Sequence, residues 1–434
     1  MEARVLVSES VERNVLLGEL LDRIGWFARN SALGSRPARG RFAPPCQGVV
    51  CTMLRTTDAC AAILVFAAVV PAQLTISDGN MNVVSGALSP TAQTPCTLQL
   101  RSDATLVNHA FEHWWYYRVA GDTQEFALRN VGTVTQGITA ASDHLDRDFM
   151  NVDSRSLLRA SVDMDVYDAG PASGVVISRL TVMNISASPV TASFFCYTDL
   201  DITGTAANDF ATGTGSRHFV TDSSGVQIEV RAFGNDRSDI GAYPTIRNML
   251  TNTAVDNLSN TLPPFTGDYT GAFQWDRTFQ PLEQRTFTVL LAVDTAATLP
   301  PLVENYGIGN GPFGEIHTQT IPLQDNSQVR TFSIAMKGAV PSTIYRTVIG
   351  FAPYNAAPFI GGLDFWVDPF AIIGVWGEAR LTSATGTTIE TFMIPSSPYL
   401  TGLAVYSQHF YFDVTAPNGF AYFTPGMMTR IGKL

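Results

Sequence analysis

The sequence predicts an all-β protein built from a large antiparallel β-sandwich of the supersandwich type and a small C-terminal β-sandwich. Two observations support this prediction. Charged residues make up only 15% of the chain and hydrophobic residues 45%, with 35 Gly and 24 Pro, a composition that favours short strands joined by turns. Strand-like apolar runs also recur along the chain, each closed by turn residues, and no internal repeat indicates a propeller.

Residues 53–72 have the organisation of a secretory signal peptide. Arg55 precedes an apolar run from Ala59 to Val70, and Val70-Pro71-Ala72 supplies a small-residue cleavage site. The run is too short to cross a hydrocarbon core of about 30 Å. We therefore expect a secreted, periplasmic or extracellular protein with no transmembrane span in the mature chain. A buried core helix is the alternative for this segment.

Residues 1–52 precede that segment, although signal peptides begin chains. We interpret them either as an upstream stretch wrongly included before Met53 or as a real extension, disordered or helical over 10–29. Cleavage after Ala72 leaves two cysteines, Cys96 and Cys196. In an exported chain these two could form a disulfide, and a buried thiol at Cys196 is the alternative.

The large sandwich is expected over residues 73–297. Gly174–Ile185 and Val190–Ile202 are separated by a short turn, which predicts an antiparallel hairpin. Val226–Phe233 and Arg285–Val293 are further predicted strands. Asn248–Asn260 is the one predicted helix, because its leucine and alanine side chains recur every four residues.

A Pro/Gly/Asn-rich passage predicts a linker at 298–325, and strand patterning resumes in the small sandwich at 326–434. Seven short strands are the number expected of a small sandwich. The predicted strands are Thr331–Met336, Thr343–Ile349, Gly362–Val367, Gly374–Leu381, Thr388–Ile394, Gly402–Val414 and Phe420–Phe423.

Two resemblances add to this prediction. The closing segment, with Ile394-Pro395, Leu400–Asp413 and Asn418-Gly419, resembles the C-terminal module of uncharacterised bacterial secreted β-sandwich proteins. The body resembles mutarotase-type supersandwich proteins through Phe126-Ala-Leu, the strand end Thr198–Gly204 and Gly271–Trp275. These resemblances imply a fold and export, and they supply no catalytic residues.

The charge balance bears on the partners. The formal net charge is −11, and Lys337 and Lys433 are the only lysines. No basic patch appears, which argues against a nucleic-acid partner. An acidic surface is also poorly matched to anionic membranes.

The segment DLDITGTAAND supplies the main candidate ligand-binding residues: Asp199, Asp201, Asn208 and Asp209. It begins like a calcium loop, because Ca²⁺ prefers several carboxylate and carbonyl oxygens, so Asp199 and Asp201 are candidate Ca²⁺ ligands. The segment lacks the bidentate glutamate of an EF-hand, since the twelfth position is Phe210. Tyr197 would share a strand face with both aspartates. A polar turn with no ligand is the alternative.

Two further acidic groups are candidates for a glycosidase-type carboxylate pair. One contains Asp143, Asp146 and Asp148 around His144, and the other contains Asp163, Asp165 and Asp168. Solvated strand faces are the alternative for both groups.

Asn108–Arg118 is rich in aromatic side chains, among them the ligand-binding candidate Trp115. Its rings could form a sugar-stacking platform, and core packing is the alternative. The sequence has no Gly-x-Ser-x-Gly, phosphate-loop, dinucleotide-binding or Cys-x-x-Cys motif. We therefore expect a structural or binding role at the cell envelope or outside the cell rather than an enzyme, with polysaccharide or envelope components as partners. A carbohydrate-binding or carbohydrate-active protein of the glycoside hydrolase or mutarotase type is the alternative.

Overall fold

The fold was analysed in a computed structural model of the chain. The structure describes residues 74–79, 81–85, 108–128, 134–138, 143–149, 151–152, 155–170, 173–294, 301–310, 315–318, 323–324, 329–337, 339–354, 366–368, 372–384, 386–417, 419 and 421–433. These residues all belong to one unit, Val69–Leu434. The predicted extension 1–52, the predicted signal peptide 53–72 and most of the predicted strand Gly362–Val367 lie outside the described residues.

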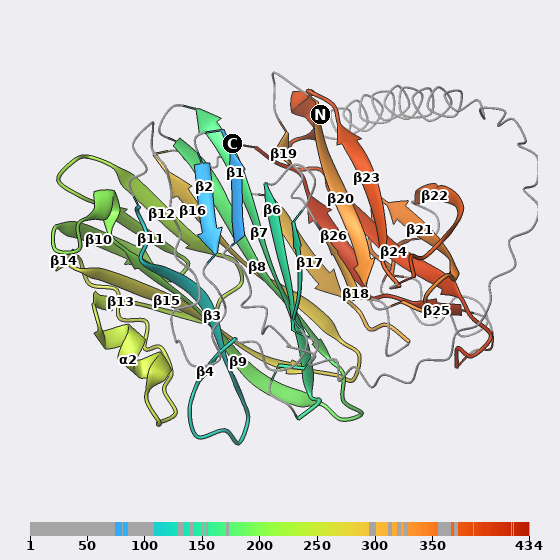
Figure 1. The fold of residues 1–434 in the computed structure, drawn as a ribbon, viewed down its shortest axis with the longest axis horizontal. Helices are drawn as coiled ribbons and strands as arrows, with labels where there is room; N and C mark the ends of the chain where they lie inside the picture. The colour runs from blue at the N-terminus through green and yellow to red at the C-terminus, as the bar shows by residue number, and fades with distance from the viewer. Residues whose placement is uncertain are drawn as a thin grey trace, which may run out of the picture. The chain divides into compact units, whose positions relative to one another are not determined.

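The described chain consists mostly of antiparallel strands with a single α-helix, so the all-β prediction is confirmed. Its largest sheet has nine strands in the order β14-β10-β11-β12-β16-β8-β7-β6-β5 (Figure 1). In chain order these strands are β5 Val134–Ile138, β6 His144–Phe149, β7 Leu158–Gly170, β8 Ser173–Asn184, β10 Asp209–Thr214, β11 Arg217–Thr221, β12 Gln227–Ala232, β14 Phe265–Gly267 and β16 Gln284–Val293.

A second sheet has five strands in the order β13-β15-β9-β3-β4. These strands are β3 Glu112–Val119, β4 Phe126–Ala127, β9 Val190–Leu200, β13 Arg237–Ala242 and β15 Tyr269–Phe279. The helix α2, Thr245–Thr251, follows β13 (Figure 1). The predicted helix Asn248–Asn260 thus begins earlier and ends at Thr251. Leu258 lies beyond the helix, where it is buried and its amide donates to Oε1 of Gln274.

The two sheets pack face to face through a shared aromatic core. The Phe194 ring of β9 stacks on Phe287 of β16 with centroids 5.1 Å apart. Trp275 of β15 lies 5.6 Å from the same Phe287 ring, and the Trp115 indole of β3 donates to the Ser178 hydroxyl of β8 over 2.9 Å. Large rings bury much apolar surface, and the core they form joins two sheets into the sandwich that the sequence predicts.

The predicted hairpin is wrong, because β8 and β9 lie in different sheets. β8 pairs with β7 and β16, whereas β9 pairs with β3 and β15. The turn between them carries the chain from one sheet to the other. Both strands are buried along almost their whole length. A strand that is apolar on both faces can join either sheet of a sandwich, so its residues do not indicate which strand it pairs with.

The remaining described strands pair antiparallel, except for β19 and β27. The β1–β2 hairpin (Leu74–Asp78, Met81–Ser85) contacts the end of β7, where the Asp168 amide donates to Asp78. Residues from 301 onward form a six-stranded sheet, β17-β26-β24-β21-β22 with β25 attached, a three-stranded sheet, β18-β20-β23, and the parallel pair β19-β27. Their bounds are β17 Leu302–Tyr306, β18 Glu315–Thr318, β19 Leu323–Gln324, β20 Arg330–Lys337, β21 Ile344–Gly350, β22 Ile372–Leu381, β23 Thr388–Ile394, β24 Ala404–Phe412, β25 Ala421–Phe423, β26 Gly426–Arg430 and β27 Gly432–Lys433.

The segment 298–325, expected as a linker, therefore contains three strands, β17, β18 and β19. Side chains connect it to the large sheet, since the Gln284 amide of β16 donates to the Ile316 carbonyl of β18. In the part of the chain that the structure describes, no helix is long and apolar enough to cross a membrane.

Candidate functional site

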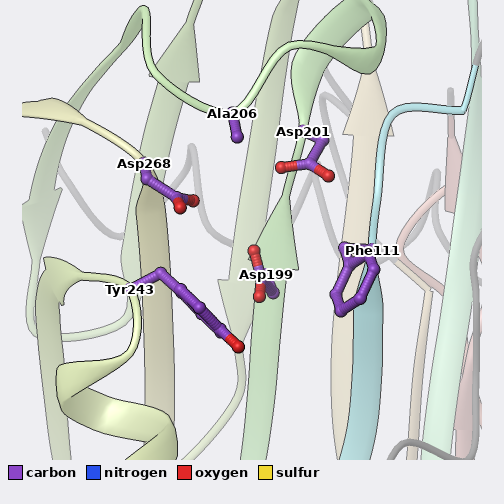
Figure 2. A pocket seen from close by; sticks show the side chains of 6 residues that line it. All are labelled: Phe111, Asp199, Asp201, Ala206, Tyr243 and Asp268. Atoms are coloured by element: carbon purple, nitrogen blue, oxygen red, sulfur yellow. The ribbon is translucent and has the colours of Figure 1, made fainter.

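A hollow of about 170 Å³ opens at one end of the five-stranded sheet. Three carboxylates converge on it, with one aromatic ring on either side (Figure 2). Its lining residues are Phe111, Asp199, Asp201, Ala206, Tyr243 and Asp268. Its volume is smaller than the roughly 300–1,000 Å³ of pockets for drug-sized ligands, so it suits one small ring or a hydrated ion.

The register of four adjacent strands builds this hollow. Asp199 is the second-last residue of β9 and pairs with Thr270 of β15, and the next pair is Leu200 with Tyr269. Asp201 follows Leu200 and Asp268 precedes Tyr269, so both lie at the same end of this ladder. On the other side of β9, the Phe111 amide donates to the Asp199 carbonyl over 2.9 Å. On the other side of β15, the Tyr243 amide donates to the Asp268 carbonyl over 2.9 Å. Antiparallel pairing thus gathers residues from four distant parts of the chain.

The three carboxylates lie unusually close together. One oxygen from each of Asp199, Asp201 and Asp268 lies within 4.8 Å of the others, and Asp201 and Asp268 point toward each other across Asp199 (Figure 2). Tyr197 donates its hydroxyl to Oδ2 of Asp199 over 3.2 Å. Among the described residues, no lysine or arginine forms an ion pair with any of the three.

This crowding changes the acidity of the group. Burial, followed by repulsion from Asp201 and Asp268, raises the pKa of Asp199 to about 8. Burial also raises the pKa of Asp201, and burial together with Asp201 raises the pKa of Asp268. Burial, followed by repulsion from Asp199, raises the pKa of the Tyr197 hydroxyl far above its usual range. At neutral pH the carboxyl group of Asp199 is therefore mostly protonated.

Two exposed aromatic rings flank the carboxylates. Phe111 is 43% exposed and Tyr243 is 39% exposed, although most large apolar side chains of this sandwich are buried. An aromatic face carries negative charge density and attracts the polarised C–H groups of a sugar ring or a cation. The hollow thus combines hydrogen-bond acceptors with two surfaces for stacking.

Two of the predicted binding residues lie beside the hollow without lining it. Asn208 forms hydrogen bonds with the hydroxyls of Thr205 and Ser223. Asp209 begins β10 opposite Gly267 and is fully buried. Burial raises the pKa of Asp209 to about 7, and the charges of Asp201 and Asp268 contribute to this rise.

Trp115 and Tyr197 have different positions relative to the hollow. Trp115 is fully buried in the shared core and lies 5.5 Å from the Trp275 ring, which agrees with the core-packing alternative for its segment. Tyr197 is also buried, and it contacts the site only through the hydrogen bond of its hydroxyl to Asp199.

The other two acidic groups come together on adjacent strands of the nine-stranded sheet. Asp146 of β6 lies opposite Asp163 of β7, and His144 lies opposite Asp165. Arg179 pairs with Asp165, while Lys337 of β20 pairs with Asp146 and Asp148. All of these side chains are buried. They form a buried ionic network, so these carboxylates do not lie on solvated strand faces. The other two members of the predicted groups, Asp143 and Asp168, are half-buried.

Cys196 is buried in the core, with Sγ 3.7 Å from Nε2 of His113. Burial lowers the pKa of His113 to about 3, so this imidazole is neutral at physiological pH. Cys96 lies outside the described residues, and its pairing with Cys196 stays a prediction.

Sequence reasoning identified Asp199 and Asp201 but missed Asp268, Phe111 and Tyr243. Asp268 precedes the strand Tyr269–Phe279, of which the sequence indicates only Gly271–Trp275, through its resemblance to supersandwich proteins. Phe111 belongs to the aromatic segment Asn108–Arg118, in which the sequence favours Trp115 as the binding residue. The polar residues just outside each strand end could have indicated this site, because antiparallel pairing brings the ends of neighbouring strands together.

No family model and no curated protein matches this chain. Among solved structures, the chain is similar to a bacterial glucoamylase complexed with acarbose, with a TM-score of 0.33 and 10% identity over 44% of this chain and 27% of that one. It is also similar to a human-microbiome protein assigned as a kojibiose phosphorylase, with a TM-score of 0.23 and 9% identity over 49% of this chain and 26% of that one. The chain thus spans about a quarter of the length of each.

Proposed function

We propose that this protein binds a saccharide in the hollow at the end of the five-stranded sheet. The observation that carries the proposal is the meeting of three carboxylates with two exposed aromatic rings around one small cavity. Carboxylate oxygens accept hydrogen bonds from sugar hydroxyls, and such charge-assisted bonds are the stronger ones. Phe111 and Tyr243 offer faces for the C–H side of the ring. Oxygens of all three aspartates lie within 4.8 Å of one another, a spacing that suits several acceptors directed at one ligand.

The proposal places the protein outside the cytosol, at the cell envelope or beyond it. This part rests on the signal-peptide pattern of residues 53–72. Sequencing the N-terminus of the exported product tests it, with a mature start after Ala72 as the expected result. A product that stays in the cytosol with residues 53–72 attached would contradict it.

The binding proposal is tested with a glycan array, followed by calorimetric titration of each glycan retained. Phe111→Ala and Tyr243→Ala should each weaken binding at least about tenfold, because each removes one stacking face. Tyr399→Ala is the matched control, since Tyr399 is 85% exposed and lies outside the hollow; it should bind like the wild type. A scaffold would retain no glycan, and that result, or unchanged binding by both hollow variants, would refute the proposal.

A further inference from the structure

We propose that Asp163 and His144 form a buried site that holds one proton in the folded protein at neutral pH and releases it when the chain unfolds. The site belongs to the buried ionic network of β6, β7, β8 and β20 and lies outside the hollow at the end of the five-stranded sheet. Saccharide binding in the hollow plays no part in it.

His144 lies between two carboxyl groups of β7. Its Nδ1 lies 2.8 Å from Oδ1 of Asp165. Because Asp165 also pairs with Arg179, it acts as the acceptor, and Nδ1 of His144 carries the hydrogen. The other ring nitrogen, Nε2, lies 3.8 Å from Oδ1 of Asp163 and has no hydrogen-bond partner among the described residues.

This arrangement is attractive only when one proton lies between His144 and Asp163. A neutral imidazole with its hydrogen on Nδ1 presents a lone pair at Nε2, and that lone pair would face the negative charge of an ionised Asp163. A proton on Nε2 makes the contact an ion pair, whereas a proton on Asp163 makes it a hydrogen bond donated by the carboxyl group. Either position of the proton satisfies both side chains.

The enclosure of Asp163 supports the same conclusion. Its side chain is 0% exposed, and neither carboxylate oxygen accepts a hydrogen bond from a described residue. Buried polar atoms in folded proteins nearly always have a partner, and an ionised carboxylate without one is especially costly. Burial, followed by repulsion from Asp146, accordingly raises the pKa of Asp163 well above its usual range.

The charges of the network balance only with this proton. The described side chains of the network contribute four carboxyl groups, Asp146, Asp148, Asp163 and Asp165, and three permanent cations, Arg159, Arg179 and Lys337. The adjoining strand β5 contains no charged residue, and Asp78 of β1 pairs separately with Arg330 of β20 over 3.8 Å. Four negative charges against three positive ones leave one buried charge in excess, which is costly. One proton on Asp163 or His144 removes that excess.

The proposal fixes the sign of a pH dependence. In the unfolded chain, aspartate and histidine have pKa values of about 3.9 and 6.5, so both have lost their protons well above pH 7. The folded protein still holds one proton there, so its stability is lost as the pH rises through the range in which the pair releases that proton. In Asp163→Asn the neutral amide can donate to Nε2 of a neutral His144, and three carboxylates balance three cations without a proton.

Urea unfolding of the full chain from about pH 6.5 to about pH 9.5, followed by tryptophan fluorescence, tests the site. Relative to Asp163→Asn, the unfolding equilibrium constant of the wild type should rise by up to about tenfold per pH unit. Glu304→Gln removes an exposed carboxylate from β17 and is the matched control, whose curve should run parallel to that of the wild type. Far-ultraviolet circular dichroism verifies that each variant is folded.

Proton release gives a second, direct measurement. When the protein is unfolded near pH 8 in weakly buffered solution with a pH indicator, the wild type should release about one proton more per chain than Asp163→Asn. Asp163→Ser, whose hydroxyl can also donate to Nε2, gives the same comparison if Asp163→Asn does not fold. Parallel unfolding curves for the wild type and the neutral variant, or equal proton release by the two, would overturn the site.

Discussion

Replacing Lys337 by methionine removes the cation that lies between two buried carboxylates of β6. The Lys337 ammonium lies 3.0 Å from both oxygens of Asp148 and also donates to Asp146. Lys337 is 8% exposed and Asp148 is 5% exposed. Methionine keeps most of the length of the side chain, so the change is chiefly one of charge.

The magnitude follows from this geometry. At an effective dielectric constant of about 20, two unit charges 3 Å apart attract by roughly 5–6 kcal/mol. The desolvation of the lysine offsets part of this attraction, and removing one partner of a buried ion pair typically costs about 3–5 kcal/mol. We expect Lys337→Met to lower the free energy of unfolding by that amount near pH 8.

The loss of unfolding free energy in Lys337→Met should decrease as the pH is lowered. Burial, followed by repulsion from Asp146, already raises the pKa of Asp148, and loss of the lysine should raise it further. A carboxyl group whose pKa is raised in the folded state makes the protein less stable as the pH rises through that pKa. The penalty of Lys337→Met should therefore shrink on acidification, because the freed carboxylates take up protons.

Urea unfolding monitored by circular dichroism and by tryptophan fluorescence gives the assay. Arg155→Met is the control, because it breaks the more exposed pair with Asp122, and it should cost at most about 1 kcal/mol. Adding Asp146→Asn and Asp148→Asn to Lys337→Met should recover most of the loss. A penalty for Lys337→Met no larger than that of the control, or one that is independent of pH, would contradict a stabilising role for the Lys337 ion pairs.

The remaining predictions concern the buried histidines and the core. Burial lowers the pKa of His409 to about 3, below its ordinary value, so its contribution to stability is lost as the pH falls from about 6.5 toward 3. Relative to His409→Gln, the wild type should lose up to about 1.4 kcal/mol of unfolding free energy per pH unit in that range. Parallel curves of unfolding free energy against pH for the two proteins would contradict this. His218, whose pKa burial also lowers to about 3, should behave likewise in His218→Gln. Trp115→Ala should cost about 3–5 kcal/mol in urea unfolding, because it leaves a cavity between the sheets. Since Trp115 does not line the hollow, the folded variant should keep wild-type glycan binding, and a selective loss of glycan binding would contradict the core-packing role of this ring.

The strands could be predicted from the sequence because strand formation depends on a residue's immediate neighbours. Arg285–Val293 and Thr388–Ile394 alternate or run apolar between turn residues, and the structure has β16 and β23 there. Two of the three carboxylates of the site could be predicted for the same reason, since Asp199 and Asp201 are separated by one residue at one strand end.

Only the tertiary structure decided which strands are neighbours. β8 and β9 follow each other closely along the chain but lie in opposite sheets. Asp146 pairs with Asp163 across two strands, a contact that their spacing along the chain does not predict. Asp268 reaches Asp199 and Asp201 because β15 pairs with β9 in one particular register. That register is selected by the fit of two apolar faces across the whole sandwich, a property of many distant residues together. Local patterns along the chain are therefore enough to locate the strands and two of the acidic residues, whereas the packing of the sheets brings the site together.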